Sequence, residues 1–200
     1  MPLATPLAHV LRHSVAALAQ HPYHDLNIGY RHAIYQALGL PRSRQHMPMP
    51  VGQKRRVQLA LLTVRHVLPH WEALYPTNRR PHRLLQATEA LLLGTRTDVD
   101  DIIPNFFDLF YADNAGDEIG LAATWALHVA RADNEWTPNH LNYDLNDSQL
   151  SGPDHDTAFF AAIAYTNGPW WGEGSSKAKR FEFWTWWLTD AVPSAWETFS

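Results

Sequence analysis

The last part of the chain, residues 180–196, constrains the fold most strongly, because large aromatic side chains recur in it at helical spacing. An i, i+3, i+4, i+7 pattern places one set of these side chains on a single face of a helix. The set consists of Trp184, Trp187, Leu188 and Ala191. We interpret it mainly as core, because large aromatic residues dominate buried area. Trp186 and Trp196 flank the stripe and are the residues of this helix that would face a partner.

Signals at both ends support this terminal helix. Ser175 and Ser176 precede it as candidate N-caps, and Pro193 marks where regular helical hydrogen bonding should stop or bend. Helical spacing also recurs upstream, and the apolar positions of the first stripe are Leu7, Val10, Leu11, Val15 and Leu18. Further helices are predicted at about 26–38, 53–71, 81–93, 117–131 and from a cap at Asp154 or Asp156 to Tyr165.

Strands are not signalled anywhere in the sequence. No segment alternates apolar and polar residues with turn signals at both ends. Within the helix predicted at 53–71, Pro69 should kink or split the helix, because it has no N–H to donate. Residues 41–50 and 134–153 are predicted to be loops. At 200 residues the chain suits one well-buried domain. We therefore predict an all-α fold, a single compact multi-helix domain over residues 1–200.

Charge divides the chain unevenly. Residues 1–96 contain 12 basic and 3 acidic side chains, whereas residues 97–200 contain 4 basic and 17 acidic side chains. Such an imbalance can steer a basic partner to an acidic surface, but two interleaved halves can equally neutralise each other inside the domain. The basic residues are spread over several helices without a recognisable module, so nucleic-acid binding is not predicted.

The sequence offers few signs of export or of thiol chemistry. It contains no cysteine, and the apolar positions near the N-terminus are interrupted by His9, Arg12 and His13. No apolar run approaches the roughly 18 residues that cross a bilayer. We expect a cytoplasmic protein that does not bind membranes.

Histidine pairs raise an enzyme alternative. His66 and His70 have the i, i+4 spacing of metal ligands, but Pro69 lies between them and no His-Glu-x-x-His motif is present. His24-Asp25 and His155-Asp156 resemble the metal-binding dipeptide of helical HD-type phosphohydrolases. Chance accounts for such dipeptides in a chain with 12 histidines.

A glycine-rich loop at residues 168–177 gives a second alternative. It lacks the Gly-Lys-Ser/Thr ending of a phosphate-binding loop, so we interpret it as a tight connection between helices. Trp170 and Trp171 in this loop are also suited to stacking on a sugar or a peptide. A carbohydrate- or peptide-binding module therefore stays open.

Several blocks resemble the Imm5 family of immunity proteins from bacterial polymorphic toxin systems. The likeness rests on residues 67–76, 80–85, 89–95 and the terminal block 180–196. The resemblance implies a mostly α-helical, non-enzymatic inhibitor that needs no cofactor or metal and binds a cognate toxin domain. It transfers a role and no site.

Acidic residues after Thr97 are the candidates for contact with that toxin. Their charge can steer a basic partner, and one neighbouring tyrosine can act as an aromatic anchor. These toxin-binding candidates are Asp98, Asp100, Asp101, Asp108 and Tyr111.

Overall fold

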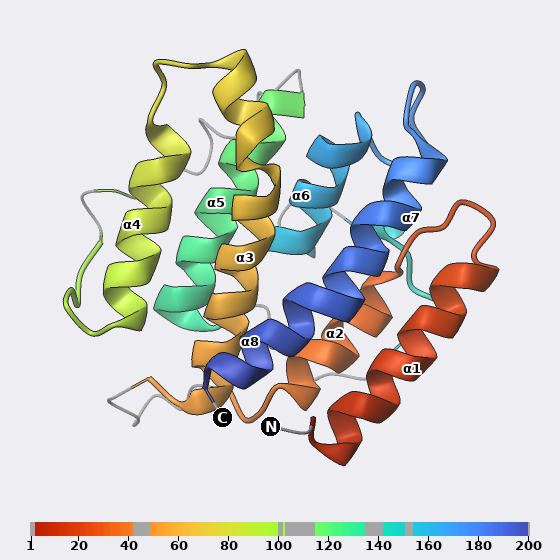
Figure 1. Ribbon diagram of the computed structural model, residues 1–200, viewed down its shortest axis with the longest axis horizontal. Coiled ribbons are helices and arrows are strands. Elements are labelled where there is room, and N and C mark those ends of the chain that lie inside the picture. The colour runs from red at the N-terminus through yellow and green to blue at the C-terminus, as the bar shows by residue number, and fades with distance from the viewer. Residues whose placement is uncertain are drawn as a thin grey trace.

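The helical spacing of the apolar residues produces helices along the chain. The computed structural model (Figure 1) describes residues 3–41, 49–99, 102, 115–134, 142–150 and 154–199. Within these residues there are helices and no strand, which confirms the predicted all-α class. The α-helices are α1 (Thr5–Gln20), α2 (Ile28–Ala37), α3 (Val51–Leu74), α4 (Arg80–Leu92), α5 (Ala115–Ala132), α6 (Thr157–Thr166), α7 (Lys177–Trp186) and α8 (Val192–Thr198). Two short turns are η2 (Asp147–Gln149) and η4 (Trp187–Ala191).

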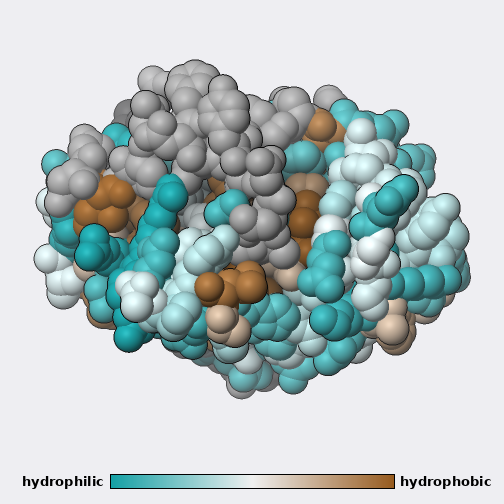
Figure 2. All heavy atoms as spheres, turned by 90° about the horizontal axis from the view of Figure 1, so that it is seen from above, coloured by the Kyte–Doolittle hydropathy of each residue, from teal (hydrophilic) through white to brown (hydrophobic). Residues whose placement is uncertain are grey.

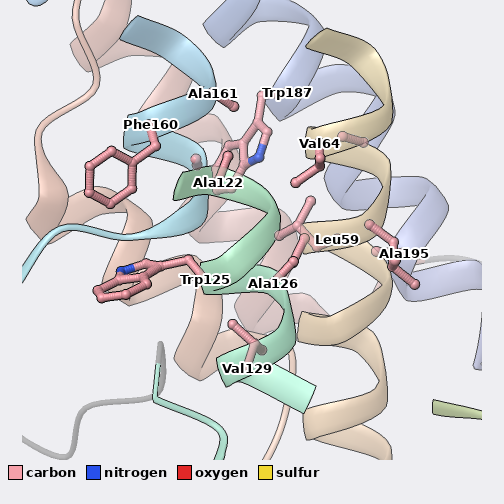
Figure 3. Close-up of a cluster of buried hydrophobic side chains, with 14 of the residues drawn as sticks. Leu59, Val64, Ala122, Trp125, Ala126, Val129, Phe160, Ala161, Trp187 and Ala195 are labelled. Carbon is pink, nitrogen blue, oxygen red and sulfur yellow. The ribbon is translucent and has the colours of Figure 1, made fainter. Parts of the chain in front are cut away.

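Helix α5 lies at the centre of one compact domain and packs against α3, α4 and α6. Helix α4 lies at one edge of the domain and α1 at the opposite edge (Figure 1). Small side chains on α5 allow the close approach: Ala122 and Ala126 have no exposed surface. Figure 3 shows them near Leu59 and Val64 of α3.

The last three helical segments, α7, η4 and α8, form one continuous rod (Figure 1). Ser176 is its N-cap, because its Oγ accepts a hydrogen bond from the backbone N–H of Lys179 at 3.3 Å. The middle segment is a π-helical turn in which the N–H of Val192 donates to the carbonyl of Trp187. Pro193 follows directly, and its ring has no N–H to donate. Regular α-helical bonding is therefore interrupted where the sequence predicts it.

The aromatic stripe of this rod is buried, which confirms its interpretation as core. Trp184 and Trp187 are 1% and 0% exposed, and their rings meet edge to face with centroids 5.8 Å apart. The Trp187 indole donates to Oγ1 of Thr63 at 3.0 Å, and the Trp184 indole donates to Oδ1 of Asp25 at 2.7 Å. The other two members of the stripe, Leu188 and Ala191, are also buried.

Three details differ from the simplest expectations. The sequence places Val15 in the apolar stripe of α1, but its side chain is 44% exposed. The buried face of α1 is therefore narrower than the spacing of its apolar residues indicates. Of the two alternatives at Pro69, a kink or a split, the split does not occur, because α3 continues through Pro69 to Leu74. Trp196 is buried against Arg55, whose guanidinium carbon lies 3.4 Å from the ring centroid. Among the described helices, none is long and apolar enough to cross a membrane.

Candidate functional site

Arg31 of α2 is fully buried and holds two carboxylates from the second half of the chain. Its Nη2 donates to Oδ1 of Asp147 at 2.5 Å, and its Nε donates to Oδ2 of Asp156 at 2.7 Å. Burial opposes the charge on the guanidinium, yet the two carboxylates raise the pKa of Arg31 well above its ordinary value. Asp156 also caps α6 by accepting from the N–H of Phe159 at 2.7 Å. This cluster ties α2 to α6.

Arg56 of α3 forms a second buried ion pair. Its Nε and Nη2 donate to the two carboxylate oxygens of Asp133 at 2.7 and 2.8 Å, and its Nη1 donates to the carbonyls of Tyr35 and Gly39. In both clusters the arginine comes from the basic half and the carboxylate from the acidic half. Part of the charge imbalance is thus neutralised inside the fold, as the interleaving alternative predicts.

The two His-Asp dipeptides contribute their aspartates to packing and capping. Oδ1 of Asp25 accepts the Trp184 indole, and burial together with the negative charge of Asp147 raises the pKa of Asp25 to about 6. Asp156 is bound to Arg31. Across the described residues, no three or more His, Cys, Asp or Glu side chains gather as a group that could hold a metal ion.

His66 and His70 serve as aromatic packing surfaces between α3, α6 and the terminal rod. The ring of His66 stacks on Trp186 with centroids 3.6 Å apart, and the ring of His70 lies parallel to Tyr165 at 5.5 Å. Burial lowers the pKa of both histidines. Their i, i+4 spacing therefore places two imidazole rings against aromatic neighbours.

The glycine-rich loop connects α6 to α7, as predicted. Trp170 stacks on Tyr23 with centroids 4.6 Å apart, and Trp171 is 43% exposed and parallel to Phe159 at 6.1 Å. A cavity of about 10 Å³ beside these rings has room for about one water molecule. The described loop therefore presents an aromatic surface beside this small cavity.

A much larger pocket, of about 650 Å³, runs along α4 from the turn that follows α3 to Arg96 and Ile102. Its volume falls in the range of ligand-binding clefts. Oδ1 of Asn78 accepts the backbone N–H of Arg80 at 3.0 Å, which fixes the start of α4, and Pro81 follows in the first turn. The helix thereby presents several cations at one place. The arginines that line the pocket are Arg79, Arg80, Arg83 and Arg96.

The charge of this pocket is poorly compensated within the described part of the chain. Nη2 of Arg80 is buried there without a hydrogen-bond partner. Two carboxylates lie on the same helices, but each already has a partner: Oε1 of Glu72 is 3.0 Å from Nε2 of His82, and Glu89 pairs with Arg65. The described lining of the pocket therefore contains four arginines and no carboxylate.

The predicted toxin-binding candidates follow the pocket in sequence. Asp98 is exposed, and its backbone carbonyl accepts a hydrogen bond from Nε of Arg96 at the pocket wall. The structure therefore brings the start of the predicted acidic segment to the pocket. The remaining candidates lie outside the described residues, so their positions are not tested: Asp100, Asp101, Asp108 and Tyr111.

Sequence reasoning missed the arginine pocket. The pattern Arg79-Arg80 with Arg83 was visible, and so was the scarcity of carboxylates in the first half. The sequence pattern does not indicate the turn between α3 and α4, which brings Arg79, Arg80 and Arg83 together around a concave surface. Seen from above (Figure 2), the described surface shows small separate apolar areas among hydrophilic residues.

Comparison with known proteins shows a family match over most of the chain. The family model described as immunity protein Imm5 matches residues 11–194, which include both buried ion pairs and the α4 pocket. No curated protein matches the chain.

Proposed function

The chain belongs to the Imm5 family of immunity proteins, and we propose that it binds and neutralises a cognate toxin domain of a bacterial polymorphic toxin system. The observation that carries this proposal is the family match, which extends over residues 11–194. Within that frame, the protein acts in the cytoplasm of the producing cell or its kin.

Inhibition by stoichiometric binding, without turnover, is the mechanism that the side chains favour. The aspartates and histidines considered for catalysis are engaged in ion pairs, caps and ring stacks. A rigid helical scaffold with a buried aromatic core suits an inhibitor that presents one fixed surface. Binding then blocks the substrate cleft of the toxin or holds the toxin in an inactive conformation.

The proposed contact surface includes the acidic candidates after Thr97. Asp98 is the described member of this group, and it is exposed beside the α4 pocket. Asp100, Asp101, Asp108 and Tyr111 complete the proposed set. Their charges would act mainly on the rate of association with a toxin that carries basic residues around its active site.

Titration of the toxin encoded by the neighbouring gene tests the proposal. Co-expression should restore growth of cells that make the toxin, and purified toxin should lose activity linearly until one equivalent has been added. If a small fraction of one equivalent progressively inactivated all of the toxin, the protein would be acting as a catalyst. Absence of both binding and protection would refute the proposed function.

A further inference from the structure

The pocket along α4 combines an apolar floor with a cationic wall. Ala90 and Ile102 line it and are only partly buried, so they form an apolar floor that a partner can reach. Arg83 is exposed on the same helix, one turn from Arg79. Protein interfaces commonly have an apolar centre and are enriched in arginine, which often contributes strongly to affinity.

The guanidinium group of Arg80 in this pocket needs an acceptor that the described residues do not supply. Nη2 of Arg80 is buried and unpartnered, and Nη1 of Arg79 lies 3.4 Å from a ring nitrogen of His82. By contrast, the guanidinium of Arg56 is bound by both oxygens of Asp133. The planar fork of arginine matches a carboxylate in this bidentate way. Carboxylates are therefore the groups that would complete the pocket.

Resting on the proposed function, we propose that the α4 pocket receives an acidic segment of the toxin. Aspartate or glutamate side chains of that segment pair with Arg79, Arg80 and Arg83, and an apolar side chain of the same segment packs on Ala90 and Ile102. The apolar floor favours a peptide segment over a free phosphate, because a phosphate offers nothing to pack against it. The toxin surface then carries an acidic patch as well as the basic groups that the acidic candidates would meet.

Charge reversal at the pocket, with a matched reversal elsewhere, tests this inference. Arg83→Glu should weaken binding of the neighbouring gene's toxin by about 30-fold or more, because it sets a negative charge against the acidic segment. The control is Arg12→Glu on α1, at the opposite edge of the domain, which has the same change in net charge. The control should bind within about twofold of the parent. Isothermal titration calorimetry measures both affinities.

Two further measurements separate binding from folding. Thermal melting of Arg83→Glu should match that of the parent, and the milder Arg83→Gln should give a smaller loss of affinity. A lysine in place of one acidic residue of the toxin should restore binding to Arg83→Glu. This rescue would identify the carboxylate that faces the pocket.

The outcomes distinguish this inference from the proposed function. If the unmodified protein does not bind the toxin, the proposed function fails and the inference falls with it. If the unmodified protein binds and Arg83→Glu binds equally well, the α4 pocket is not part of the interface and the proposed function stands. Titration of the protein with pyrophosphate tests whether the pocket binds a phosphate instead of a carboxylate. Saturable binding below about 1 mM that is lost in Arg80→Gln would assign the pocket to a phosphate-bearing ligand and overturn the inference.

Discussion

The buried ion-pair clusters and the α4 pocket use the same residue type in opposite ways. Arg31 and Arg56 are completely buried, and each is bound by carboxylates from the other half of the chain. Arg80 and Arg83 come from the same basic half but line an open pocket whose described lining contains no carboxylate. Net charge along the sequence therefore says little about where charge remains available for a partner.

The two regions also differ in the sign of their excess charge. Around Arg31 lie the carboxylates of Asp147 and Asp156, and Asp25 is close enough for its pKa to respond to Asp147. That cluster has more carboxylates than it needs to neutralise Arg31, whereas the pocket has more guanidinium groups than acceptors. An excess inside the core affects stability, and an excess at the surface is available for binding.

Replacement of Arg31 by methionine should produce the largest effect. It keeps much of the side-chain volume but leaves Asp147 and Asp156 buried without their cation, so the free energy of unfolding should fall by about 3–5 kcal/mol. Urea denaturation at neutral pH measures this loss. The matched control is Arg83→Met in the pocket, which should change the stability by less than about 0.5 kcal/mol. Equal losses in the two variants would break the distinction between the regions.

Replacement of Asp25 by asparagine tests the excess of negative charge in the buried cluster, because the effect of Asp25 on stability depends on pH. The pKa of Asp25 is raised from its ordinary value of 3.8 to about 6 in the folded state, first by burial and then by Asp147. Between those values the folded state binds more protons than the unfolded state, so Asp25 lowers stability progressively as pH rises through the window. Above it the penalty reaches at most about 3 kcal/mol.

Asp25→Asn should therefore stabilise the protein at neutral pH and leave it almost unchanged near pH 4. Asparagine keeps an oxygen that can accept the Trp184 indole, so the hydrogen bond of 2.7 Å can persist. Denaturation at the two pH values tests the sign. A loss of stability at neutral pH would mean that attraction to Arg31 and Arg180 outweighs burial, and that the buried cluster has no excess of negative charge.

The helices could be predicted from the sequence because their signals are local. The stripe from Trp184 to Ala191 needed only the spacing of its own residues, and Ser176 lies directly before its helix. Val15 shows the limit of that method. Spacing assigns a residue to a face, but the width of the buried face depends on which helices pack against it.

The sites were harder to predict because they join distant residues. Arg31 is separated from Asp156 by 125 positions, and nothing near either residue in the sequence indicates the other. The α4 pocket likewise depends on the turn that precedes Arg80. The family resemblance supplied the role, which the match over residues 11–194 supports, but it supplied no contact residue.

Replacement of Arg83 by glutamine should produce a small effect of the opposite sign to Arg31→Met. Arg79 and Arg83 are like charges four positions apart at the start of a helix, where positive charge is also unfavourable. Removal of one charge should raise the free energy of unfolding by about 0.3 kcal/mol at low salt. High salt should abolish the gain through screening. A clear loss of stability would show that Arg83 has a stabilising role within the fold.

The smallest expected effect concerns Asp98, because it should change a rate and leave stability nearly unaltered. If the acidic candidates steer a basic part of the toxin, Asp98→Asn should slow association by roughly twofold at low salt, with less effect at physiological salt, where screening acts over about 8 Å. Glu173→Gln, an exposed change on the loop between α6 and α7, is the matched control and should leave the rate unaltered. Stopped-flow measurements give the association rate of both variants.

Faster association of Asp98→Asn would mean that the approaching toxin surface is acidic, so the arginines of the α4 pocket alone would set the charge preference. A large loss of thermal stability would instead assign Asp98 to the structure of the segment that follows α4.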